Sequence, residues 1–161
     1  MLFRSFLQDG ALQFVLLGSG DAWLENEFRK LAAAHPARCA VRIGYDNGLS
    51  HRIEGGCDFF LMPSRFEPCG LNQMYSMAYG TLPIVRATGG LADTVVGWDG
   101  ADQGTGIVFR DADVGGVEWA LRRALKLYAK PATYRRLQKA AMKAEFSWAR
   151  SAEEHLAFYQ A

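Results

Sequence analysis

The stretch from Phe59 to Val95 constrains the fold more strongly than any other part of this sequence. It reads FFLMPSRFEPCGLNQMYSMAYGTLPIVRATGGLADTV. Two short apolar runs, 59–62 and 82–85, each end in a loop that leads into a helical pattern. A short apolar run bounded by turn residues is typical of a strand that is covered on both faces. The stretch therefore predicts two adjacent parallel strands, each followed by a loop and a helix.

The same alternation of strand and helix runs through most of the chain. Further strands are predicted at 13–17, 39–43 and 106–109, and further helices at 22–34, 49–55 and from Val114 onward. Such alternation is the signature of a parallel sheet with helices on both faces. We therefore predict an α/β fold with a Rossmann-like parallel sheet flanked by helices and a helical C-terminal tail.

Smaller signals refine the ends of this pattern. The first twelve residues predict the end of a helix, whose apolar stripe is Leu2, Phe3, Phe6 and Leu7. Ser50 and Ser147 are predicted helix caps, and Pro131 suits the first turn of a new helix. In the last helix Ala152, Leu156 and Tyr159 are predicted to face inward, and residues 97–106 to form a surface loop. The sequence has no linker or repeat, so residues 1–161 are predicted to form a single domain.

The composition excludes several classes of function. Eighteen Lys and Arg residues against seventeen Asp and Glu residues give a net charge of +1, which predicts no basic field for nucleic acid. The three cysteines are an odd number without the spacing of a zinc site, which favours a reducing compartment. No segment approaches the length of a transmembrane span. We expect a cytoplasmic protein that needs no cofactor and no metal.

The two loops of the opening stretch are the candidate binding site. In open α/β sheets ligands bind at the carboxyl ends of the strands, where free helix amides favour phosphate. Glu67 can accept hydrogen bonds from sugar hydroxyls, and the amides of Gly70 and Leu71 follow directly. This chemistry predicts a sugar phosphate or a nucleotide sugar as ligand. The alternative, in which Glu67 only caps a helix, stays equally open at this point.

Four other positions carry weaker signals. Tyr45 ends a strand on the same edge, where its ring can stack on a base or sugar or simply pack. Thr88 and Gly89 can offer a hydroxyl and amides, or form a plain turn. Cys69 is predicted at the start of a helix, a position typical of reactive thiols, although a small residue in a tight turn is the simpler explanation. The Gly18-Ser19-Gly20 turn lacks the third glycine of a dinucleotide fingerprint, so a plain strand-to-helix turn is favoured.

The run PSRFEPCGLNQMYSMAYGTLPIVRATGGLADTV closely resembles bacterial glycogen synthases and plant starch synthases. The resemblance extends through LLGSGD, IGYDNGLSHRIEGGCDFFLMPS, GIVF and EFSWARSAEEHLAFY, and so covers nearly the whole chain. It implies the C-terminal domain of a GT-B glycosyltransferase that transfers glucose from ADP-glucose to an α-glucan with retention. Many related glycosyltransferases carry a second glutamate eight positions after the first, but Tyr75 stands there. That departure points to a glycogen or starch synthase.

The resemblance also implies roles for individual residues. Glu67 resembles the active-site carboxylate that contacts the donor glucose. Cys69, Gly70 and Leu71 resemble the segment that meets the donor's distal phosphate and sugar. Tyr45 resembles the residue that packs on the adenine, and Thr88 and Gly89 resemble the second loop beside the nucleotide.

Part of the family pattern has no counterpart in this sequence. The family has an N-terminal domain with acceptor contacts, and its C-terminal domain begins with an arginine and a Lys-Gly pair that hold the pyrophosphate. We therefore expect an N-terminally truncated domain that is inactive alone, whose missing strand exposes apolar surface and favours self-association. Two alternatives remain, namely an inactive nucleotide-binding or oligomerising module and a transferase for another nucleotide sugar.

Overall fold

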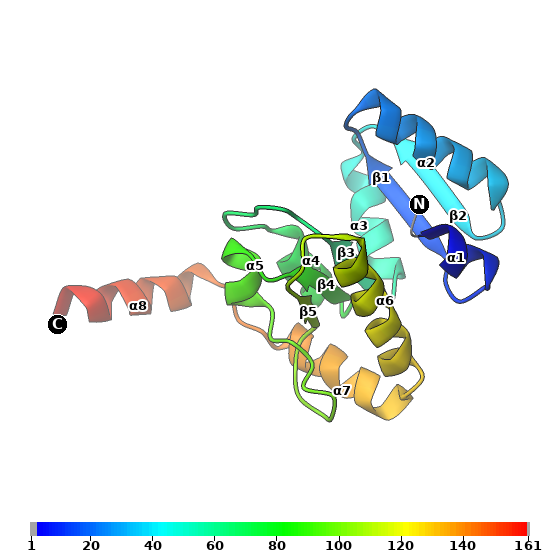
Figure 1. Ribbon diagram of the computed structural model, residues 1–161. Coiled ribbons are helices and arrows are strands. Elements are labelled where there is room, and N and C mark those ends of the chain that lie inside the picture. Colours follow the sequence, from blue (N-terminus) through cyan, green and yellow to red (C-terminus); the bar gives the residue numbers. More distant parts are fainter. Residues whose placement is uncertain (1–2, 161) are drawn as a thin grey trace. The chain divides into compact units, whose positions relative to one another are not determined.

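The computed structural model describes residues 3–160, so the predicted helical position Leu2 lies outside the described residues. The chain separates into two compact units, Met1–Gly56 and Cys57–Ala161. Each unit is an alternation of strands and helices (Figure 1). The two units are described separately below.

The first unit is built on a pair of parallel strands. Its elements are α1 (Phe3–Gln8), β1 (Phe14–Gly18), α2 (Ala22–Ala34), β2 (Cys39–Ile43) and α3 (Asn47–Gly56). Phe14 lies opposite Cys39, and the strands stay in register to their ends. A small core forms where Leu7 and Leu31 pack with Cys39, and burial raises the pKa of the Cys39 thiol. The predicted strand–helix–strand order of this part is confirmed.

The cap of α3 differs from the prediction. The helix begins at Asn47, and Asp46 accepts a hydrogen bond from the Leu49 N–H through Oδ1 at 2.9 Å. Ser50 lies inside the helix, and its hydroxyl donates to the Asn47 carbonyl at 2.8 Å. The prediction of Ser50 as the cap was therefore wrong, because an aspartate before the helix is an equally good cap and stands at the true start.

The second unit holds a three-stranded parallel sheet in the order β3-β4-β5. Its elements are β3 (Phe59–Met62), α4 (Asn72–Ala78), β4 (Leu82–Arg86), α5 (Gly89–Thr94), β5 (Ile107–Phe109), α6 (Val114–Tyr128), α7 (Pro131–Met142) and α8 (Trp148–Gln160). Four of the five β4 residues are buried, whereas all four β3 residues are only partly buried. The prediction that the strand at 59–62 is covered on both faces was therefore wrong, because β3 lies at the edge of this sheet and stays partly exposed, whereas the central strand β4 is buried.

The last helix is exposed along the side that was predicted to face inward. In α8 the side chains of Leu156 and Tyr159 are 58% and 81% exposed, and Ala152 is exposed as well. Trp148 at its start is 90% exposed. The prediction of an inner face was wrong, because the apolar spacing specifies an amphipathic helix but not what covers it.

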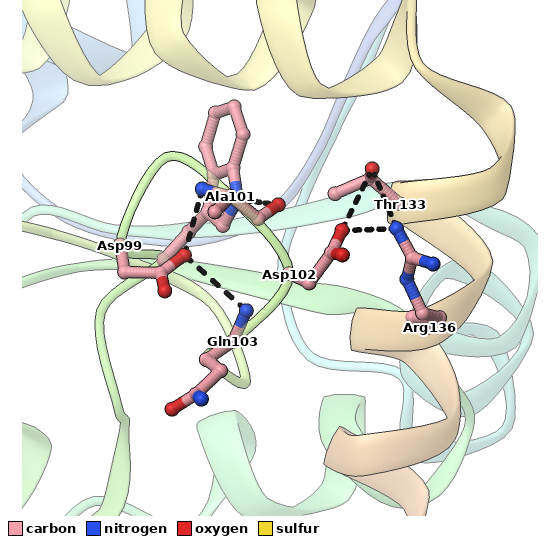
Figure 2. A network of polar contacts seen from close by, with 7 residues as sticks. Asp99, Ala101, Asp102, Gln103, Thr133 and Arg136 are labelled. Carbon is pink, nitrogen blue, oxygen red and sulfur yellow. Dashed lines mark hydrogen bonds and ion pairs between the residues drawn. The ribbon is translucent and has the colours of Figure 1, made fainter.

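The predicted surface loop at 97–106 is held by its own polar side chains (Figure 2). Asp99 Oδ1 accepts from the N–H groups of Ala101 at 2.8 Å and Gln103 at 3.2 Å. Asp102 accepts from the Thr133 hydroxyl at 3.3 Å and pairs with Arg136, both on α7. An aperiodic segment is thus ordered by turn hydrogen bonds and by its attachment to a helix.

An aromatic cluster joins α6 and α7 to the sheet. The Tyr134 ring packs edge-on against Phe59 and Tyr128, with ring centroids 5.5 and 5.4 Å away. Its hydroxyl donates to the Asp58 carbonyl at 2.9 Å, and burial raises the pKa of that hydroxyl. The Asp58 carbonyl also accepts from the Leu82 N–H at 3.1 Å. The cluster therefore attaches α6 and α7 to the start of β3.

Replacing Tyr134 by Phe is expected to lower the free energy of unfolding by about 1–2 kcal/mol, because it keeps the ring and removes two hydrogen bonds, one donated to the Asp58 carbonyl and one accepted from Gln138 Nε2 at 3.3 Å. The matched control is Tyr128→Phe, whose side chain is 49% exposed. Its effect is expected to stay within about 0.5 kcal/mol. Urea unfolding of both variants measures the difference, and equal effects would contradict the assigned role of the Tyr134 hydroxyl.

Candidate functional site

The two predicted loops lie side by side at the carboxyl end of the sheet in the second unit. The first loop (residues 63–71) follows β3, and the second loop (residues 87–90) follows β4 and includes the first residues of α5. The Gly90 N–H donates to the carbonyls of both Glu67 and Pro68, at 3.2 Å each. The prediction that two adjacent parallel strands end in neighbouring loops is confirmed.

Two glycines make this approach possible. Gly89 has φ +42°, and a Cβ there would collide with the Glu67 carbonyl oxygen. A Cβ on Gly90 would collide with the Cys69 carbonyl oxygen. Any larger side chain would therefore separate the two backbones. Gly89 thus has a structural role in addition to its predicted place beside a ligand.

The end of the first loop turns sharply at Gly70, which has φ +73°. The helix α4 begins at Asn72, two residues later than the predicted start near Gly70, and Leu71 is its N-cap. The first amides of a helix have no acceptor within the helix. In α4 these free amides follow directly after Gly70 and Leu71. Cys69 is exposed, and its thiol donates to the Gly70 carbonyl at 3.4 Å.

Glu67 is partly buried in the middle of the first loop. Its backbone carbonyl is committed to Gly90, whereas its carboxylate takes part in no hydrogen bond or ion pair among the described residues. Because Leu71 holds the N-cap position of α4, Glu67 is not the N-cap of that helix. The carboxylate is thus held in place by its backbone.

Thr88 lies in the second loop, and its hydroxyl makes no capping hydrogen bond to α5. It is the N-cap of α5 in an extended conformation, but its side chain accepts no capping hydrogen bond. Only its backbone carbonyl takes part in the turn, accepting from the Leu91 N–H at 3.1 Å. A second polar group is therefore present beside the first loop.

Tyr45 belongs to the first unit and lies just beyond β2. Its side chain is 89% exposed, so it does not pack in a core. The hydroxyl donates to Asn47 Oδ1 at 3.5 Å, and the preceding Gly44 has φ +130°. The ring is thus presented to solvent on a turn after a strand.

Two residues of the site were missed from the sequence. Arg86, at the end of β4, donates to the carbonyls of Ser64 at 2.8 Å and of Arg65. Gln73 is fully buried, and its amide donates to the first loop and to Thr94 at the end of α5. The sequence does offer a hint for each residue. Arg86 is a charged residue at the end of a buried strand, and Gln73 lies one helical turn before the buried Met77. Neither signal indicates a partner.

Two observations concern the described residues as a whole. Among the side chains that the structure describes, no three His, Cys, Asp or Glu come together in a group able to hold a metal ion. None of the helices between residues 3 and 160 is long and apolar enough to cross a membrane.

Comparison with known proteins agrees with this architecture. The family described as "Glycosyl transferases group 1" matches residues 2–144. Glycogen synthase from Anaeromyxobacter sp. (strain Fw109-5) is 53% identical over 149 residues, which are 92% of this chain and 31% of that protein. Glycogen synthase from Thioalkalivibrio sulfidiphilus is 52% identical over 158 residues, which are 96% of this chain and 33% of that protein.

Solved structures give the same result. The catalytic domain of starch synthase IV from Arabidopsis thaliana, bound to ADP and acarbose, matches with a TM-score of 0.82 and 36% identity. That match covers 99% of this chain and 34% of that chain. Sucrose-phosphate synthase from Thermosynechococcus elongatus matches with a TM-score of 0.65 and 24% identity, over 97% of this chain and 41% of that chain, and shows the fold alone.

The α/β architecture, with parallel strands flanked by helices and further helices at the C-terminus, thus matches glycosyltransferase structures of the GT-B class, as predicted. The chain belongs to the group 1 glycosyltransferase family, and the resemblance to glycogen and starch synthases is confirmed. It spans about a third of the length of the curated relatives that it matches.

Replacing Gly90 by Ala is expected to lower the free energy of unfolding of the second unit by about 1–3 kcal/mol, because the new Cβ would collide with the backbone. The matched control is Gly97→Ala in the same unit, where the nearest atom to a Cβ lies 3.4 Å away. That variant is expected to change stability by less than about 1 kcal/mol. Urea unfolding compares them, and a Gly90 variant as stable as the control would show that the loops need not touch.

Proposed function

We propose that this chain is the donor-nucleotide-binding domain of a glycogen or starch synthase. The complete enzyme would transfer glucose from ADP-glucose to the non-reducing end of an α-1,4-glucan with retention. The observation that carries the proposal is the joined pair of loops at the ends of β3 and β4, in a chain about half identical to glycogen synthases over nearly its whole length. The ADP-bound starch synthase structure supports the choice of nucleotide.

Each site residue has a proposed role in holding the donor. The segment from Cys69 through Gly70 to Leu71 would meet the distal phosphate and the sugar, since amides at a helix start favour a phosphate. Thr88 and Gly89 would line the nucleotide from the second loop. Tyr45 would stack on the adenine, for which its exposed ring is suited.

Glu67 is the proposed catalytic residue. Its carboxylate would contact the donor glucose and stabilise positive charge that develops at the anomeric carbon. In the proposed reaction the bond from that carbon to the ADP oxygen breaks, and the 4-hydroxyl of the glucan attacks from the same face and gives its proton to the departing phosphate. No protein nucleophile is required, so catalysis rests on positioning and on stabilising the charge of the departing phosphate.

The acceptor is assigned to the part of the relatives that this chain does not match. Because the chain spans about a third of their length, we propose that it supplies the donor-binding part of such an enzyme and does not transfer glucose alone. A role as a nucleotide-binding or self-associating module and a preference for another nucleotide sugar are the alternatives. A cytoplasmic location stays a prediction from the cysteine pattern.

Calorimetry with ADP tests the donor site directly. Replacing Tyr45 by Ala is expected to weaken ADP binding about tenfold, because a stacking contact of about 1.4 kcal/mol is lost. The matched control is Trp23→Ala, which removes a ring that is 71% exposed in the same unit and is expected to leave the affinity unchanged. Absence of ADP binding by the unaltered chain would leave only a structural role, and tighter binding of UDP-glucose than of ADP-glucose would favour the other donor.

Replacing Glu67 by Gln separates contact with the sugar from contact with the nucleotide. The substitution keeps the shape and removes the charge, so ADP affinity is expected to stay within about twofold and ADP-glucose affinity to fall about tenfold. Both are measured by calorimetry on the same preparation. Equal losses for the two ligands would place Glu67 beside the nucleotide instead of the glucose.

A further inference from the structure

The buried amide of Gln73 connects the first loop to α5, the helix that begins in the second loop, and we propose that Gln73 is a positioning residue that sets the spacing between the two loops for donor binding. This inference rests on the proposed function. Gln73 lies in the first turn of α4 and is fully buried, so it does not itself meet a ligand. Its effect on the donor would act through the residues it holds.

The amide nitrogen of Gln73 donates to the first loop and to α5. Nε2 lies 3.2 Å from the Cys69 carbonyl and 3.0 Å from the Gly70 carbonyl, both in the first loop. It lies 3.1 Å from Thr94 Oγ1, at the end of α5. The Thr94 hydroxyl donates its proton to the Gly90 carbonyl at 2.6 Å, so it accepts from Gln73. All three partners are acceptors, which fixes the orientation of the amide and excludes a carboxylate.

The amide oxygen of Gln73 shows that packing alone does not account for a glutamine at this position. Among the described residues, Gln73 Oε1 is buried without a hydrogen-bond partner. It lies 2.6 Å from where a Cβ on Gly70 would stand, so a larger residue there would displace the amide. A buried unpaired acceptor is costly, and an apolar side chain of the same length would avoid that cost. The stabilising contribution of Gln73 therefore comes from the bonds that Nε2 makes between the loops.

These bonds close a ring through both loops. It runs from the Cys69 and Gly70 carbonyls through Gln73 and Thr94 to Gly90, whose N–H returns to Glu67 and Pro68. Glu67 and Cys69, which are proposed to meet the donor, thus have their backbone positions tied to the second loop. Because binding and catalysis depend on placement within fractions of an ångström, loosening this ring would reduce donor affinity without removing a donor contact.

Gln73→Met in the full chain tests this role with two measurements. Amide hydrogen exchange at Gly90 is expected to become about tenfold faster, because the ring that holds the second loop is open. ADP affinity measured by calorimetry is expected to fall about tenfold. The control is Tyr134→Phe, which weakens the same unit through the aromatic cluster and is expected to change neither measurement.

A second variant guards against a general loss of folding. Thr94→Val removes the α5 hydroxyl that accepts from Gln73 and donates to the Gly90 carbonyl of the second loop, and it is expected to reproduce both effects. In the double variant the losses in ADP affinity are expected not to add, because each change opens the same ring. Fully additive losses would overturn the proposal.

The outcomes separate this inference from the proposed function. If the unaltered chain binds no ADP, the proposed donor site and the positioning role of Gln73 are both overturned. Hydrogen exchange at Gly90 then decides only whether Gln73 couples the two loops. Unchanged exchange at Gly90 in Gln73→Met would overturn the coupling. Faster exchange with unchanged ADP affinity would overturn the positioning role while leaving the donor site in place.

Discussion

The parallel pairing of β3 and β4 is the constraint on which the candidate site depends. Parallel strands end at the same edge of a sheet, so the loops that follow them become neighbours although α4 separates them in the sequence. The contact is then made by backbone atoms, since the Gly90 N–H lies between two carbonyls of the first loop. Only glycine at positions 89 and 90 allows this approach. Sheet topology, glycine placement and the site are therefore parts of one arrangement.

Much of this arrangement follows from the sequence. The strands at 39–43 and 59–62 and the helix at 22–34 have the bounds that apolar runs between turn residues predict. Parallel pairing follows from the alternation of strand and helix. The position of the site follows in turn, because the loops at the carboxyl ends of such strands are where open α/β sheets bind ligands. These inferences need only local periodicity and one topological rule.

The remaining features depend on tertiary contacts that local patterns do not encode. Ser50 and Asp46 are both acceptable caps, and only the true start of α3 decides between them. The amphipathic spacing of α8 predicts an apolar face, but the described residues leave that face exposed. Gln73 and Arg86 act on partners in other elements of the unit. Their residue types are visible in the sequence, whereas their partners are visible only in the fold.

The polar side chains of the second unit divide into two groups at this edge. Arg86 and Gln73 use their donors on backbone carbonyls of the first loop, so they set its shape. Glu67 and Thr88 are placed by their backbones, and their side chains take no part in holding the loops. A group that must meet a ligand cannot also be committed to the scaffold, because binding would then break the contact that positions it. This division is what a preorganised donor site requires, and it explains why the scaffold is built from backbone hydrogen bonds, glycines and one buried amide.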